Sequence, residues 1–131
     1  MTTPADAKYV SLTTFRRNGN PVSTPVWIAP LEGELAVITV DNVGKTKRLA
    51  HTDRVELRPC NGRGHVPEGA PVWTGTGRVL RGEGDVARVR RAIAAKYGIQ
   101  ASAFTLVEKV SALLPFLPQP KPRAGILITL D

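Results

Sequence analysis

Several segments have residue patterns typical of β-strands: β-branched and aromatic residues, a short apolar run, or apolar residues that alternate with polar ones. The segment 54–60, for example, alternates apolar Val55 and Leu57 with charged residues. The segment 34–40 is apolar on both faces, which predicts a central strand. Strands are predicted over residues 8–14, 21–29, 34–40, 54–60, 72–80 and 125–130.

Turn residues separate these strands. Two positions also predict a turn type and the place of a strand in the sheet. Asn18-Gly19 predicts a hairpin with a type I′ turn, because both central positions of that turn require positive φ. Pro25 cannot donate a ladder hydrogen bond, so its strand is expected to lie at a sheet edge or to contain a bulge.

Three segments have the period of an amphipathic helix. The first, 43–52, would be capped by Asp41 or Asn42. The second, 85–98, ends at Gly98, a residue suited to a C-cap, and the third covers 102–115. About six antiparallel strands with two or three helices packed on one side predict a mainly β (α+β) protein whose sheet curls into a barrel.

The length of 131 residues fits a single domain over residues 1–131. No apolar run approaches the roughly 18 residues of a membrane span, and the first residues lack the features of a signal peptide. We therefore expect a cytoplasmic protein without a membrane span. The single cysteine, Cys60, excludes an internal disulfide and a cysteine-based zinc site.

The net charge of +7 favours an anionic partner, such as nucleic acid, a membrane surface or a phosphorylated or carboxylated small molecule. Positive charge is concentrated just after the strand 34–40. On a helix, Lys45 and Arg48 can reach past the strand end while Leu49 faces the core, and Lys47 approaches from the flank. With the N–H groups of the helix start, these cations would form a phosphate cradle. A solvated basic helix explains the same residues equally well.

Other candidate ligand contacts are less specific. The stretch STPVW, residues 23–27, places a proline among hydroxyl residues and leaves backbone groups unpaired for a flat polar ring. Thr39 points a hydroxyl at the same end of the sheet, although such residues are usually ordinary strand residues. Trp27 and Trp73 either stack on a ligand or fill the core or a subunit interface, and the residues alone favour the latter.

Several classes of chemistry lack support. Cys60 has no Cys-His signature with His51 or His65, which disfavours nucleophilic catalysis, and two histidines without clustered carboxylates do not predict a metal site. No Rossmann, P-loop or α/β-hydrolase motif occurs. The aromatic residues do not interleave with basic ones, so a nucleic-acid partner is unlikely.

The order of the motifs resembles a known superfamily. LTTFRRNGNPVSTPVWIAP, then ELAVITVDNVGKTKRLAHTDRVELRPCNGRG, then KYG after a helix, are similar to the pyridoxamine 5′-phosphate oxidase-like split β-barrels. More specifically, the chain resembles the F420-dependent flavin/deazaflavin oxidoreductases of the FDOR-B group. The resemblance covers roughly residues 9–98.

This resemblance implies a homodimer of split barrels with cofactor sites along the subunit interface. It places residues 24–27 beside the tricyclic ring and Thr39 with the Lys45 to Arg48 segment at the phosphate. The cofactor-binding residues that we expect are Thr24, Pro25, Val26, Trp27, Thr39, Lys45, Lys47, Arg48, Cys60 and Trp73. No catalytic residue is assigned.

The implied cofactor is the deazaflavin coenzyme F420, with FMN as the alternative. The broad basic segment suits the phosphodiester and carboxylates of F420. The implied reaction is hydride transfer from the reduced deazaflavin to a small organic acceptor: a quinone, an unsaturated carbonyl or a tetrapyrrole-like molecule. An FMN-binding oxidoreductase, a non-catalytic cofactor binder and, more remotely, a nucleic-acid-binding barrel remain alternatives.

Overall fold

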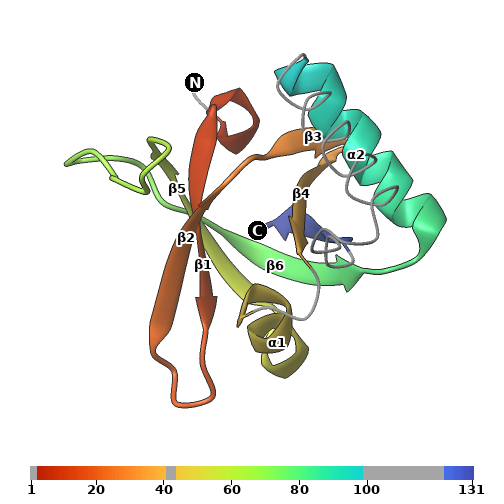
Figure 1. The fold of residues 1–131 in the computed structure, drawn as a ribbon. Helices are drawn as coiled ribbons and strands as arrows, with labels where there is room; N and C mark the ends of the chain where they lie inside the picture. The colour runs from red at the N-terminus through yellow and green to blue at the C-terminus, as the bar shows by residue number, and fades with distance from the viewer. Residues whose placement is uncertain (1–2, 41–43, 99–122) are drawn as a thin grey trace, which may run out of the picture.

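The fold is a single antiparallel sheet of seven strands that curls into a split barrel, in the order β2-β1-β5-β6-β7-β4-β3 (Figure 1). It is seen in a computed structural model that describes residues 3–40, 44–98 and 123–131. The elements are η1 (Pro4–Asp6), β1 (Tyr9–Phe15), β2 (Pro21–Val26), β3 (Ala29–Leu31), β4 (Glu34–Val40), α1 (Gly44–His51), β5 (Arg54–Cys60), β6 (Trp73–Leu80), α2 (Glu83–Tyr97) and β7 (Arg123–Leu130).

The sheet has one more strand than the sequence predicted. The segment expected as one strand over 21–29 is divided into β2 and β3. The division falls at Trp27-Ile28, where the N–H of Ile28 donates to the hydroxyl of Tyr97 at 3.0 Å and not to a neighbouring strand. The position of Pro25 is as predicted, because β2 lies at one edge of the sheet.

The hairpin between β1 and β2 is confirmed, but its turn is not type I′. Gly19 has a φ of 87°, whereas Asn18 has an ordinary negative φ. The side chain of Asn18 instead accepts a hydrogen bond from the N–H of Asn20 at 3.0 Å, which stabilises the turn locally. Two consecutive positive φ values occur at Glu32 (50°) and Gly33 (81°), between β3 and β4.

Two apolar clusters hold the sheet together, and β4 contributes to both. Alternate residues Leu35 and Val37 face the barrel interior, where Leu49 of α1 also packs. Ala36 faces the opposite side and packs under Val89 of α2. The prediction of a central strand, apolar on both faces, is therefore confirmed. α2 was also predicted correctly, including the C-cap at Gly98, whose N–H donates to the carbonyl of Ala94 at 2.9 Å.

The C-terminal turn of α2 fastens the helix to the start of β1 and to the β2–β3 junction. The Nζ of Lys96 donates to the carbonyls of Ala7 and Ile28, each at 2.6 Å. The hydroxyl of Tyr97 accepts from Ile28 N–H and donates to the carbonyl of Lys8 at 2.7 Å. Burial raises the pKa of Tyr97 and lowers the pKa of Lys96.

Two predicted features fall outside the described residues: the helix over 102–115 and the cap at Asp41 or Asn42. Among the residues that the structure describes, no helix has the length and apolar character needed to cross a membrane.

Tyr97→Phe tests the fastening of α2. The substitution leaves the N–H of Ile28 and the carbonyl of Lys8 without their partner, so we expect a loss of roughly 1–3 kcal/mol in the free energy of unfolding. Urea denaturation measures this loss. Tyr9→Phe is the control, because no hydrogen bond of the Tyr9 hydroxyl is present in the described part of the chain. Equal stability of the two variants would contradict the assigned role.

Candidate functional site

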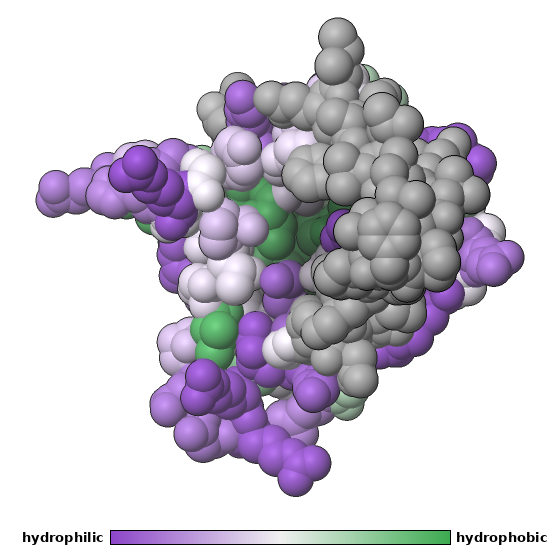
Figure 2. Space-filling view, in the orientation of Figure 1, coloured by the Kyte–Doolittle hydropathy of each residue, from purple (hydrophilic) through white to green (hydrophobic). Residues whose placement is uncertain are grey.

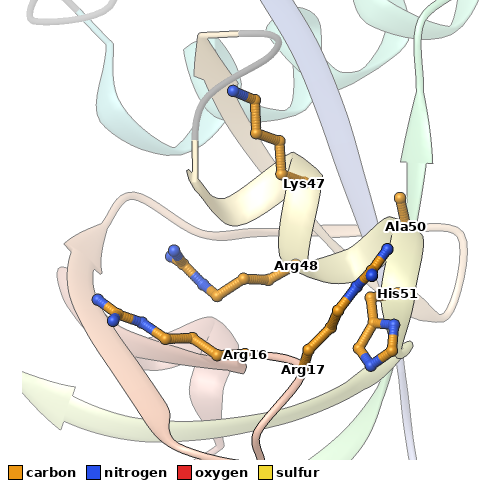
Figure 3. A pocket seen from close by; sticks show the side chains of 6 residues that line it. All are labelled: Arg16, Arg17, Lys47, Arg48, Ala50 and His51. Atoms are coloured by element: carbon orange, nitrogen blue, oxygen red, sulfur yellow. The ribbon is translucent and has the colours of Figure 1, made fainter.

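A basic hollow lies between the β1–β2 hairpin and α1 (Figure 3). Its volume is about 450 Å³. The residues that line it are Arg16, Arg17, Lys47, Arg48, Ala50 and His51. In Figure 3 the guanidinium groups of Arg16 and Arg48 extend side by side, while Arg17 extends toward His51.

The amphipathic pattern of α1 explains why its cations gather here. Leu49 and Thr46 are buried, and Leu49 belongs to the cluster inside the barrel. The helix is therefore fixed with one face inward, and its other faces carry Lys45, Lys47 and Arg48. The predicted arrangement, with Leu49 in the core and basic residues around it, is confirmed.

Arg48 is positioned by a strand residue. Its Nε donates to the hydroxyl of Thr14, which is fully buried at the end of β1, at 2.5 Å. Burial lowers the pKa of Arg48, and the nearby charge of Arg16 lowers it further. Burial likewise lowers the pKa of Lys45, with the charge of Arg48 as the second cause.

Within the described residues, the cations of the site have no acidic partner. Elsewhere several arginines of the sheet and α2 are paired with carboxylates, as in Arg54–Asp131 at 3.0 Å and Arg78–Glu34 at 3.2 Å. In the described residues no such ion pair involves the cations of α1 or the β1–β2 hairpin, namely Arg16, Arg17, Lys45, Lys47 and Arg48. Like charges that lie close together favour an anion between them.

A row of hydroxyls on the inner face of the sheet begins at the arginine site. Thr24 lies opposite Leu12 and Val22 lies opposite Thr14, so Thr14 and Thr24 are diagonal neighbours on one face. The Oγ1 of Thr24 is buried and has no hydrogen-bond partner in the described part of the chain. Since a buried hydroxyl without a partner costs free energy, this atom is a candidate ligand contact.

The molecular surface has an apolar region and a charged region next to each other (Figure 2). An apolar surface is recessed at the centre of this face. Strongly hydrophilic side chains gather below it, over the β1–β2 hairpin. The arrangement suits a molecule with a flat, weakly polar part and a charged tail.

The remaining predicted site residues are not all on one face. Thr24 and Val26 point inward, whereas Pro25 points outward and lies against Gly64 of the β5–β6 loop. Trp27 stacks on Tyr97, with ring centroids 4.5 Å apart and an interplanar angle of 9°.

Three further residues lie elsewhere along the sheet. Thr39 is buried near the end of β4, and Trp73 packs against the interior cluster. Cys60 pairs with Tyr9 on the outer face, and burial raises the pKa of its thiol, which favours the unreactive form. That these residues contact a cofactor stays a prediction.

The sequence did not indicate Arg16, Arg17 or His51 as site residues. Arg16 and Arg17 lie in a hairpin turn, where charged residues are common, and only the pairing of β1 with β5 and the packing of α1 bring them together. His51 ends α1 and was considered only as a catalytic or metal-binding residue. No cluster of metal-ligating side chains occurs in the described ranges.

Solved structures with the same architecture are found, although no family model and no curated protein matches the sequence. Rv2991 from Mycobacterium tuberculosis is similar with a TM-score of 0.68 and 18% identity, over 97% of this chain and 75% of that one. HutZ, the heme storage protein from Vibrio cholerae, has a TM-score of 0.66 and 9% identity, over 98% and 84%.

An F420 reductase has a TM-score of 0.57 and 12% identity, over 97% of this chain and 90% of that one. The chain shares the fold of these structures, which include a putative pyridoxamine 5′-phosphate oxidase from Listeria innocua. At these identities the similarity shows the fold alone. Split barrels with different ligands occur among these structures, so the ligand must be inferred from the site.

Lys45→Met tests whether the charged Lys45 side chain lowers the stability of the folded protein. Because the pKa of Lys45 is lower in the folded chain, the unfolded chain binds the proton more tightly, and the charged side chain costs stability at pH 7. We expect the variant to be more stable at pH 7 by about 0.5 kcal/mol. This gain should shrink as pH rises toward the ordinary lysine pKa of 10.5. Urea denaturation at several pH values measures it.

Lys8→Met provides the control for this measurement, because Lys8 is exposed and distant from the hollow. It should change stability little at any pH. A Lys45→Met protein that is less stable than the native one at pH 7 would contradict the account.

Proposed function

We propose that this chain binds coenzyme F420 and acts as an oxidoreductase of the split-barrel fold. The observation that carries the proposal is the group of cations at α1 and the β1–β2 hairpin that lack carboxylate partners in the described residues. The phosphodiester and carboxylates of F420 carry the charge that such a group requires. FMN, with one phosphate, would use fewer of these cations.

The residues present fit the cofactor at both of its ends. Arg16, Arg48 and Lys45 would hold the phosphate, and Arg17 with Lys47 would face the more distant carboxylates. The unpartnered hydroxyl of Thr24 would bond to a polar edge of the ring. The apolar surface recessed in Figure 2 would exclude water from the ring face.

When bound, reduced F420 supplies the hydride, and the acceptor would be a quinone, an unsaturated carbonyl or a tetrapyrrole-like molecule. The protein then contributes mainly binding and alignment. This division of labour agrees with the composition of the described site, where cations and hydroxyls occur but no pair of carboxylates suited to acid–base catalysis.

Titration of the protein with F420, FMN and hemin, followed by absorbance and fluorescence, tests the proposal. We expect saturable binding of F420 that is tighter than that of FMN. Arg48→Gln should weaken F420 binding by roughly tenfold or more, because a charge-assisted contact is lost. Turnover is then measured from the oxidation of reduced F420 with a panel of acceptors.

Arg91→Gln is the matched control, because it removes one exposed cation from α2, away from the hollow. Its F420 affinity should equal that of the native chain. Tight F420 binding without turnover would favour a non-catalytic binder, and preferential binding of FMN or hemin would replace F420 as the ligand. If Arg48→Gln binds F420 as tightly as the native chain, Arg48 is not part of the binding site and the site assignment is wrong.

We further propose that the protein is a homodimer. The outer face of β2, β1 and β5 carries the bonded pair Thr13–Ser23, with oxygens 2.7 Å apart, and Thr13 is buried. No described helix packs on this face. α2 lies on the far side of the barrel and packs against β3, β4 and β7 (Figure 1). A second copy of the chain would cover it.

Sedimentation at micromolar concentration should give the mass of a dimer. Ser23→Arg places a bulky cation on the outer face of an edge strand and should shift the protein toward the monomer. Its far-ultraviolet circular dichroism should stay native, because Ser23 is exposed in the single chain. A native protein that sediments as a monomer would contradict this part of the proposal.

A further inference from the structure

Gly44 leaves room for the charged end of Arg48. It is the first residue of α1, and Arg48 lies one turn later, so the Arg48 side chain leans back over it. A Cβ atom at position 44 would collide with Nη1 of Arg48 and would lie 3.2 Å from Cζ and 3.3 Å from Nη2. The space beside Gly44 is therefore filled by the guanidinium.

The guanidinium is held in this space from its other side. Its Nε donates to Thr14 of β1 at 2.5 Å. The terminal N–H groups have no protein partner in the residues that the structure describes. They lie beside the guanidinium of Arg16 (Figure 3), and two adjacent guanidinium groups can donate in parallel to phosphate oxygens.

We propose that Gly44 is a positioning residue that keeps this place open, so that Arg48 and Arg16 together form the phosphate subsite. Any side chain at position 44 would displace the flexible end of Arg48 and not the backbone, so the fold would persist while the subsite is lost. The identity of the ligand rests on the proposed function. The placement of the Arg48 guanidinium beside Gly44 does not depend on it.

A second glycine offers a matched control. Gly84 lies in the first turn of α2, as Gly44 does in α1, but a Cβ at position 84 meets no atom within 4 Å. Alanine favours a helix over glycine at both positions. Gly84→Ala should therefore be at least as stable as the native chain. Gly44→Ala should stay folded, and only Gly44→Ala should move Arg48.

Two measurements separate a positioning role from a structural one. The first is the nuclear magnetic resonance signal of the Arg48 Nε–H group, assigned by its loss in Arg48→Lys. It should shift in Gly44→Ala and stay unchanged in Gly84→Ala. The second is calorimetric titration with inorganic pyrophosphate and with F420. Gly44→Ala should weaken both affinities roughly tenfold, as expected for loss of a charge-assisted contact.

A double-mutant cycle assigns the effect to Arg48. In the Arg48→Lys background, Gly44→Ala should cause no further loss of affinity, because the shorter ammonium group does not reach the added methyl. An unchanged Arg48 signal in Gly44→Ala overturns the inference. The inference is also overturned if Gly44→Ala binds pyrophosphate as tightly as the unmodified protein does, or if the unmodified protein does not bind pyrophosphate.

Failure of the proposed function gives a different result. If the native chain does not bind F420, while Gly44→Ala shifts the Arg48 signal and weakens pyrophosphate binding, the positioning role stands and the F420 assignment falls. If the native chain and Gly44→Ala bind F420 equally well, the F420 assignment stands and the role of Gly44 falls.

Discussion

A buried leucine on one face of α1 holds like charges together on the other faces. Leu49 packs in the barrel interior, and Arg48 is bonded to Thr14 of β1, so the helix cannot rotate to separate its cations from those of the hairpin. Burial lowers the pKa of Lys45 and of Arg48, and the charge of a neighbouring cation lowers each of them further. The barrel core and the fastening of α2 through Tyr97 supply the stability that this arrangement requires, as is common at functional sites.

Most of the fold could be predicted from the sequence, because its signals are local. Short runs of β-branched, aromatic and apolar residues predicted the strands, and the apolar stripe of α2 predicted that helix. The break at Trp27-Ile28 was missed because it depends on Tyr97, which lies on α2, far along the chain. The type I′ turn was wrong because the side chain of Asn18 bonds to the backbone and Gly19 alone takes a positive φ.

The candidate site was predicted only in part, for the same reason. Lys45, Lys47 and Arg48 form one local pattern, and their placement around Leu49 follows from helical geometry. Arg16 and Arg17 join them only through the sheet topology. The fold does not choose the ligand, since an F420 reductase and a heme storage protein are both similar to this chain. In the described part of the chain, the cations of α1 and the β1–β2 hairpin have no carboxylate partner, and this absence together with the buried hydroxyl of Thr24 supports the proposal of an anionic ligand.

The central claim is that these gathered cations hold the anionic part of a redox cofactor. A crystal structure of the protein grown with F420 tests it most directly. The account predicts phosphate oxygens within hydrogen-bonding distance of the Arg48 guanidinium, with the ring near Thr24. An ordered F420 molecule bound elsewhere on the protein, with only solvent beside Arg48, would contradict it.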